Sequence, residues 1–198
     1  MKNNFSKGFT LVELLIVITI LAALAAAVVL VLNPAELLAQ ARDAQRLSDM
    51  TTMRDSINLF ISQVTAPNLC VTASGCSAGG HCTNGTAGPF STTTCTTVAV
   101  RTIAGAGWVT VNFTLMPGGS PIATLPMDPV NVTPYFYAFK SDNTARTFEL
   151  ATRLESVRHR VMMTTDGGNQ NTCPTTFVEQ GAFGSSCYFE VGTNVLTL

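Results

Sequence analysis

The chain has 198 residues, of which 12% are charged, and a formal net charge of −1. This length accommodates one domain of ordinary size together with an extension. The charge balance provides neither the strongly basic surface of a nucleic-acid-binding protein nor the acidic run of a disordered tail, so electrostatics alone identifies no partner.

The first predicted element is a membrane-spanning helix over residues 9–32. Glu13 is the one ionisable residue among these 24 residues, and a helix of this length spans roughly 36 Å, which exceeds the ~30 Å hydrocarbon core of a bilayer. Lys2 and Lys7 precede the segment, and Arg42 is the first cation after it. This asymmetry predicts a cytoplasmic N-terminus, with the rest of the chain outside.

Glu13 needs its own explanation, because a carboxylate inside a bilayer costs several kcal/mol unless it is paired or neutralised. A structural alternative is that its side chain reaches the nearby cytoplasmic interface. Two other interpretations of the segment are a cleaved secretory signal ending at the three alanines of residues 25–27 and an uncleaved anchor for an unrelated domain. Neither explains the acid, so we treat Glu13 as a functional residue.

The stretch KGFTLVELLIVITILAAL, residues 7–24, resembles the class III leader and N-terminal helix of type IV pilins and type II secretion pseudopilins. The shared features are a short basic leader, Gly8 before Phe9, and Glu13 ahead of an apolar helix. The resemblance implies that residues 1–8 are a leader removed after Gly8 by a prepilin peptidase, and that Phe9 becomes the N-methylated N-terminus. It also implies that Glu13 pairs with the N-terminal amine of a neighbouring subunit during assembly.

This pairing is physically reasonable. Cleavage after Gly8 creates an ammonium group at the edge of the apolar segment, and Glu13 of an adjacent helix can neutralise it. An unpaired carboxylate in a dry helical bundle is unfavourable, so a subunit in the wrong register is disfavoured. Glu13 is therefore expected to set the register of assembly.

Residues 33–65 are predicted to continue the helix as an amphipathic segment, with Pro34 in a new first turn. An apolar stripe at three- and four-residue steps predicts one face on a core; it consists of Leu37, Leu47, Met50, Met53, Ile57, Phe60 or Ile61, and Val64. The charged residues between them are expected on a solvated or subunit-facing surface: Arg42, Asp43, Arg46, Asp49, Arg54 and Asp55. In a filament, Arg42 or Arg46 is a candidate to contact Asp49 or Asp55 of a neighbour.

Residues 66–96 are rich in Gly, Ser, Thr and Cys, which predicts a long surface loop. Six cysteines follow the apolar segment: Cys70, Cys76, Cys82, Cys95, Cys173 and Cys187. An even number outside a membrane favours disulfides, for which 15 pairings exist; we expect Cys173 to pair with Cys187 and the other four among themselves. The alternative is a zinc site of Cys76, His81, Cys82 and Cys95, although the spacings are atypical. His81 is otherwise expected to be a solvated loop residue.

Residues 97–198 are predicted to form a β-sheet head with a C-terminal region that contains a disulfide. Alternating apolar residues predict strands at 97–103, 108–115, 134–139 and 147–154, with a turn at 141–144. Residues 125–131, 135–137 and 148–155 resemble the globular part of major pseudopilins. The expected fold is therefore α+β, a pilin fold in which the long N-terminal helix packs on a small antiparallel sheet.

Other ligands were considered for the head. Major pseudopilins bind calcium, and the loops offer Asp128, Asn131, Asp142, Asp166 and Asn169, but no set of these residues is predicted as metal ligands and no cofactor is expected. DNA binding stays open, because Arg153, Arg158, His159 and Arg160 cluster in sequence. Catalysis is not expected, since no GxSxG, HExxH or phosphate-binding loop occurs.

The sequence therefore predicts a structural prepilin of a type IV pilus or a type II secretion-like pseudopilus. Its expected partners are other copies, other pilins, the prepilin peptidase, the assembly platform and its ATPase, and the cytoplasmic membrane before assembly. The competing hypothesis is a membrane-anchored binding or sensor module that does not polymerise.

Overall fold

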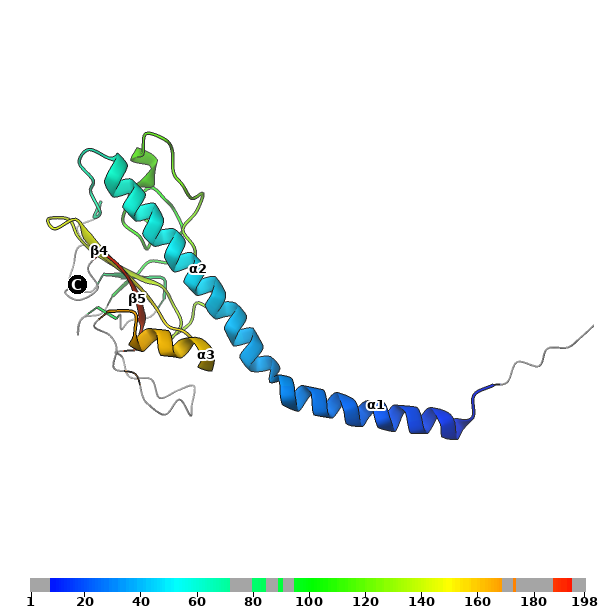
Figure 1. Ribbon diagram of the computed structural model, residues 1–198. Coiled ribbons are helices and arrows are strands. Elements are labelled where there is room, and N and C mark those ends of the chain that lie inside the picture. Colours follow the sequence, from blue (N-terminus) through cyan, green and yellow to red (C-terminus); the bar gives the residue numbers. More distant parts are fainter. Residues whose placement is uncertain are drawn as a thin grey trace, which may run out of the picture. The chain divides into compact units, whose positions relative to one another are not determined.

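The computed structural model describes residues 8–71, 80–84, 89–90, 95–168, 173 and 187–193. The chain divides into two compact units, Met1–Leu38 and Ala39–Leu198. The first contains helix α1 (Leu11–Leu32) and the start of helix α2 (Pro34–Gln63); the second, which we call the head, contains the rest of α2 and a five-stranded sheet (Figure 1).

Both long helices begin at residues suited to that position. Thr10 caps α1, because its hydroxyl accepts a hydrogen bond from the backbone N–H of Glu13 at 3.2 Å. The helix ends at Asn33, whose φ of 40° lies in the left-handed region. Pro34 then takes the first position of α2, and the Asn33 side chain accepts from the N–H of Glu36 at 3.4 Å. The interruption at Pro34 lies where the sequence predicts it.

The apolar face of α2 forms one wall of the main core. Met50, Met53, Ile57 and Phe60 are fully buried, and they pack against large residues from the sheet and from the loops before it, namely Trp108, Val109, Val111, Phe113, Tyr137, Phe139, Phe148 and Leu150. Leu47 packs in a smaller cluster with Leu154 and Met163. Leu37, which the sequence pattern placed on the same stripe, is exposed because it precedes the head.

The sheet is mixed and has the order β2-β1-β3-β4-β5. All neighbouring strands are antiparallel except β1 and β2, which pair in parallel. The strands are β1 (His81–Cys82), β2 (Thr96–Thr97), β3 (Ala138–Asp142), β4 (Thr147–Thr152) and β5 (Phe189–Gly192). The register aligns Phe139, Leu150 and Val191 on the face that packs against α2. The α+β class is confirmed, with one parallel pair in the sheet.

Two predicted strands are wrong in place or type. Residues 108–115 form no strand but an irregular segment that ends in the 3-10 helix η2 (Phe113–Leu115), and of residues 97–103 only Thr97 belongs to a strand. Val109, Val111 and Phe113 are buried in the core that α2 lines, whereas Leu115 is exposed. The backbone there makes single hydrogen bonds and an isolated bridge between Ala104 and Asn112 rather than a strand. In this segment, alternation of apolar residues therefore indicated burial of most of them but did not indicate a β-strand.

The two remaining strands are closer to prediction. β4 covers most of residues 147–154, whereas β3 begins at Ala138, four residues after the predicted start, and runs into the predicted turn. The turn lies instead before Thr147, where Arg146 has a φ of 55°. After β4 come helix α3 (Val157–Arg160) and the 3-10 helix η3 (Val161–Thr164).

Disulfides join Cys82 to Cys95 and Cys173 to Cys187. The second is the pair that we expected. Cys70 is also disulfide-bonded, and Cys76 lies outside the described residues. Because Cys82 and Cys95 are bonded to each other, they cannot ligate zinc, and the alternative zinc site is wrong.

His81 is buried in β1 rather than solvated, and this burial lowers its pKa.

Two buried carboxyl groups lie near each other on the sheet face opposite α2. Glu149 in β4 and Glu190 in β5 are each 1% exposed, and the register places them diagonally on the same face. Burial first, and then the neighbouring Glu190 carboxyl, raise the pKa of Glu149 well above its ordinary value of 4.5. Asp166 adds a third acid nearby, since its carboxylate accepts the backbone N–H of Glu190 at 2.8 Å.

We expect this acid pair to make the head less stable as the pH rises. Folded Glu149 retains a proton that the unfolded chain releases above its ordinary pKa, so stability is complete in acid and declines as pH increases beyond about 4.5, by up to about 1.4 kcal/mol per pH unit. Glu149→Gln removes this proton linkage and should flatten the decline. Urea unfolding of the full chain, followed by fluorescence of the single, buried Trp108, measures the slope between about pH 5 and about pH 8.

Asp55→Asn is the matched control, because the Asp55 side chain is 62% exposed. It should keep the wild-type pH slope. An equally steep decline in Glu149→Gln would show that the Glu149 proton does not control the alkaline stability of the head.

Candidate functional site

The predicted processing site lies immediately before α1. Phe9 is 81% exposed, and Thr10 caps the helix two residues after Gly8. A Cβ added to Gly8 would meet no other atom within 4 Å, and its backbone is not in the left-handed region. The fold therefore does not require glycine at this position, so a requirement for it would have to come from a protein that acts on this segment. Residues 1–7 lie outside the described residues.

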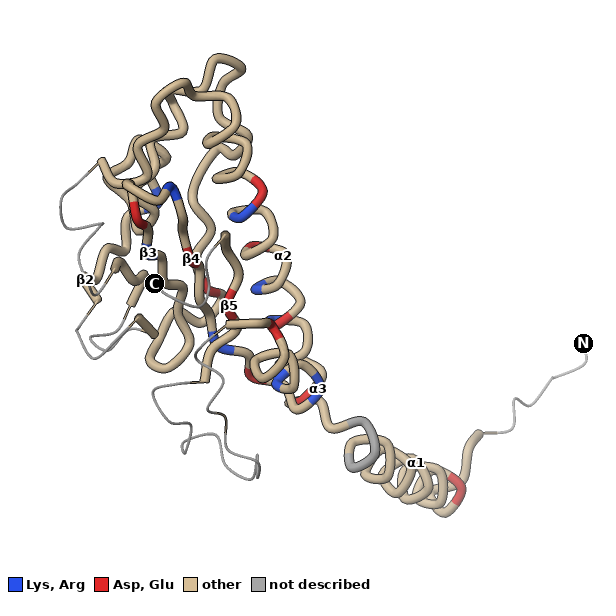
Figure 2. The backbone as a smooth tube through the Cα atoms, turned by 60° about the vertical axis from the view of Figure 1, so that its left-hand side comes forward, with Lys and Arg blue, Asp and Glu red and all other residues tan. Residues whose placement is uncertain are grey.

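Helix α1 has an apolar surface that the chain itself does not cover. All side chains of residues 11–29 are exposed, and Leu11–Val29 is the one helical segment, within the described part of the chain, that is long and apolar enough to cross a membrane. Figure 2 shows acidic colour on α1 only near its N-terminal end, where Glu13 lies in the first turn. An acid there also complements the positive end of the helix dipole.

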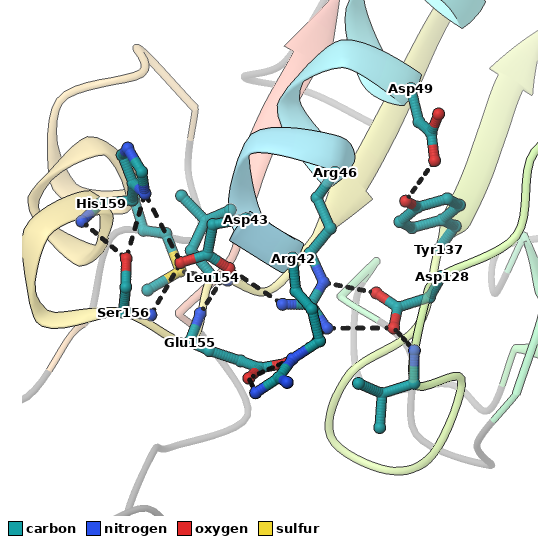
Figure 3. A network of polar contacts seen from close by, with 12 residues as sticks. Arg42, Asp43, Arg46, Asp49, Asp128, Tyr137, Leu154, Glu155, Ser156 and His159 are labelled. Carbon is teal, nitrogen blue, oxygen red and sulfur yellow. Dashed lines mark hydrogen bonds and ion pairs between the residues drawn. The ribbon is translucent and has the colours of Figure 1, made fainter. Parts of the chain in front are cut away.

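The most concentrated group of ionic contacts lies in the head around Arg46 (Figure 3). Arg46 is completely buried, and its guanidinium contacts three carboxylates: Asp43 at 2.9 Å, Asp128 at 2.6 Å and Glu155 at 2.6 Å. The ring of Tyr135 lies 5.0 Å away, within cation–π range. Burial by itself lowers the pKa of Arg46, but the hydrogen bonds to Asp128 and Glu155 raise it, so the group stays charged.

Asp43 connects the same network to the segment after β4. Its carboxylate accepts backbone N–H groups of Glu155 at 2.8 Å and Ser156 at 2.7 Å. His159 in α3 lies 3.7 Å from the same carboxylate and 3.0 Å from the Ser156 hydroxyl. Arg42, one helical turn before Arg46, donates to the Glu155 carboxylate at 2.9 Å. Two guanidinium groups of α2 are thus fixed to loops more than eighty residues away in sequence.

A second polar contact lies one turn further along α2. The Tyr137 hydroxyl donates to the Asp49 carboxylate at 2.7 Å. Burial, and then this bond, raise the pKa of Tyr137, so the phenol keeps its proton. Burial also raises the pKa of Asp49, which the bond from Tyr137 partly offsets.

These contacts correct the prediction that the charged residues of α2 form a solvated surface. Asp43 and Arg46 are fully buried, Arg42 and Asp49 are partly buried, and only Arg54 and Asp55 form an exposed pair. Arg46 already has partners within the chain, so it is not available for the predicted contact with a neighbour. The sequence pattern missed Asp128 and Glu155 as its partners because both come from distant segments.

Three of the five candidate calcium residues, all aspartates, accept hydrogen bonds within the head. Asp128 binds Arg46 and the N–H groups of Val130 and Asn131, Asp142 accepts two N–H groups of its own turn, and Asp166 accepts those of Gly168 and Glu190. Asn169 lies outside the described residues. Where the structure describes the chain, it contains no group of three or more acidic, histidine or cysteine residues arranged to hold a metal.

The basic cluster considered for DNA does not form one exposed patch. Arg160 is buried, and Arg153 is buried with its guanidinium 4.8 Å from the Tyr188 ring and donating to the Cys187 carbonyl. Arg158 is exposed, and His159 is partly exposed. These basic residues are close in sequence but do not form a continuous positively charged surface.

Asp128→Asn should destabilise the head, because it replaces one of the three carboxylates around the buried Arg46 guanidinium by a neutral amide and weakens two charge-assisted hydrogen bonds. We expect a loss of about 1.5–3 kcal/mol in the free energy of unfolding, measured by urea titration with Trp108 fluorescence. Asp55→Asn changes the same type of residue in the exposed pair and should cost no more than about 1 kcal/mol. Equal effects of the two substitutions would mean that the Arg46 contacts do not hold α2 to the head.

Comparison with known proteins gives one match. Residues 3–29 match the family model described as the prokaryotic N-terminal methylation motif. No curated protein and no solved structure gave a significant match. The matched range contains Gly8, Phe9 and Glu13 and most of α1. The chain therefore carries the N-terminal methylation motif, which is the class III signal of type IV pilins and pseudopilins.

Proposed function

We propose that this protein is a prepilin, a structural subunit that is cleaved after Gly8, N-methylated at Phe9 and polymerised through its N-terminal helix. The filament would be a type IV pilus or a type II secretion-like pseudopilus. The observation that carries the proposal is the methylation motif directly ahead of α1, a helix whose apolar side chains are exposed.

The exposed surface of α1 supports both states of such a subunit. Residues 11–29 cannot remain in water at low cost, because their side chains are exposed and complete burial of one Leu, Ile or Val is worth about 1.5–3 kcal/mol. A lipid bilayer covers this surface before assembly, and the helices of neighbouring subunits cover it in a filament. The same helix thus serves as a membrane anchor and as an assembly element.

Glu13 distinguishes this helix from a plain anchor. Cleavage after Gly8 would place a new amine four residues before the Glu13 carboxylate in sequence, and both groups would need neutralising partners inside a helical bundle. Reciprocal pairing between neighbouring subunits satisfies both and penalises other registers. An anchor that stayed alone in lipid would not need such a pairing.

The other partners follow from this role. The precursor would lie in the cytoplasmic membrane with its N-terminus inside, where the prepilin peptidase reaches the cleavage site. Its disulfide-containing head would lie outside. The chain contributes shape and register rather than catalysis. An assembly platform with its own ATPase would extract it, together with other copies and other pilins.

The competing proposal is a membrane-anchored binding module that never polymerises. The ion pairs that attach α2 within the head would suit either role. The two proposals differ in what they require of Gly8 and Glu13.

Processing is tested by intact mass and N-terminal sequencing of protein purified from membranes of a host with a prepilin peptidase. We expect a chain that begins at Phe9 and carries one added methyl group. Gly8→Val should block cleavage without altering the fold, because a side chain there contacts nothing else in the protein. A wild-type chain beginning at Val28 would indicate a secretory signal, and one retaining Met1 would indicate a plain anchor; both results contradict the prepilin proposal.

Assembly is tested by Glu13→Ala in the same host with the complete assembly machinery. Filament yield by electron microscopy and shearing should fall by at least about tenfold, since a register-setting ion pair is lost. The membrane level of the subunit should stay unchanged or rise, because removing the acid favours insertion. Glu36→Ala, which removes the next acid along the chain, serves as the control and should still assemble. Normal filaments from Glu13→Ala would contradict the assigned role.

A further inference from the structure

Five exposed apolar side chains lie at the end of the head where α2 joins it. Val130 and Val132 belong to the loop after Asp128, and Val157, Val161 and Met162 to α3 and η3; we call these five residues the valine face. Each is at least 37% exposed. They are not core residues of the head, and the functions assigned above do not use them.

Residues of the Arg46 network contact both parts of this face. Arg42 and Glu155 line a surface hollow with Val130, Val132 and Tyr135. On the other side, Asp43 binds the N–H groups of Glu155 and Ser156, directly before Val157. Figure 3 shows Arg42 between the α3 segment, with Ser156 and His159, and the loop of Asp128. The valine face therefore flanks the first turns of α2 in the head.

The more accessible charged side chains of this region are basic. Its three acids, Asp43, Asp128 and Glu155, are at most 9% exposed. Its cations are more accessible: the Arg42 side chain is 36% exposed, and Arg158 is exposed beside Val157. Apolar side chains next to accessible cations are the combination by which peripheral elements bind an anionic lipid surface.

Few residues connect this region to α1. Arg42 is the tenth residue after Leu32, the last residue of α1, so a helical path between them is roughly 15 Å long. The polar headgroup layer outside the hydrocarbon core is about 5–8 Å thick. A connection of this length is short enough to allow the valine face to reach the bilayer surface when α1 lies in the membrane.

We propose that the valine face docks on the outer surface of the phospholipid bilayer while α1 is inserted. The valines and Met162 would enter the boundary between headgroups and acyl chains, and Arg158 would lie among anionic phosphates. This inference rests on the proposed membrane insertion of α1. It adds a second membrane contact, made by the head, that would have to be released when the subunit leaves the bilayer.

Lipid fits this surface better than a second protein does. The residues that dominate protein interfaces are Trp, Tyr and Arg, whereas Val is under-represented among them. Lipid binding instead scales with apolar area and with attraction of cations to anionic headgroups, and it needs no complementary shape. Contact of these residues with a second copy would therefore contradict the proposal.

The test uses the full chain in vesicles of phosphatidylglycerol and phosphatidylethanolamine, without assembly proteins. The photoreactive residue benzoylphenylalanine replaces Val157 or Val161, and adducts are identified by mass spectrometry after illumination. The matched control replaces Leu115 in η2, which is 59% exposed against 58% for Val157. We expect phospholipid adducts at both valine positions at a yield on the order of tenfold above that at Leu115.

The charge contribution is tested in the same assay. Arg158→Glu should lower the phospholipid adduct yield at Val157 by about threefold or more, whereas Arg54→Glu, the same charge change in the exposed pair on α2, should leave it unchanged. Equal yields in the two variants would contradict the role of Arg158.

Benzoylphenylalanine in place of Ile16 in α1 separates this inference from the proposal on which it rests. Phospholipid adducts at Ile16 but none above the Leu115 level at Val157 and Val161 would overturn the docking and leave insertion intact. Cross-links to a second copy at the valine positions, instead of lipid adducts, would also overturn it. Absence of lipid adducts at Ile16 would overturn the insertion and the docking together.

Discussion

Arg46 places a permanent positive charge in the interior of the head, and the arrangement of the elements around it depends on neutralising that charge. A buried guanidinium is tolerated only where carboxylates surround it with good geometry. Here Asp43 comes from α2 itself, Asp128 from a loop, and Glu155 from the segment after β4. Satisfying one side chain therefore fixes the angle at which α2 crosses the sheet, and with it the position of α3.

The apolar core and this charged group hold α2 in different ways. Met50, Met53, Ile57 and Phe60 supply non-directional burial on one part of the helix. The Arg46 contacts are directional and lie nearer the point where α2 joins the head. Together they hold the part of α2 that belongs to the head in one position against the sheet.

Acidic residues show how environment assigns different roles to one chemical group. Glu13 lies exposed in the first turn of an apolar helix, Asp128 and Glu155 are neutralised by guanidinium groups, and Glu149 faces Glu190 in a buried site that favours its protonated form. For Glu13 we propose a partner that another molecule supplies. The others are satisfied within the head, either by an opposite charge or by a retained proton.

The sequence by itself determined where the two N-terminal helices lie along the chain. The methylation motif, the apolar helix, the interruption at Pro34 and the apolar face of α2 all follow from local order, because helical periodicity and capping act over three or four residues. The tertiary structure alone decided that Asp43 and Arg46 are buried, that residues 108–115 form no strand, and that β1 and β2 pair in parallel. Each of these depends on contacts between segments that are distant in sequence, such as those of Arg46 with Asp128 and Glu155. Local sequence patterns contain no information about such contacts.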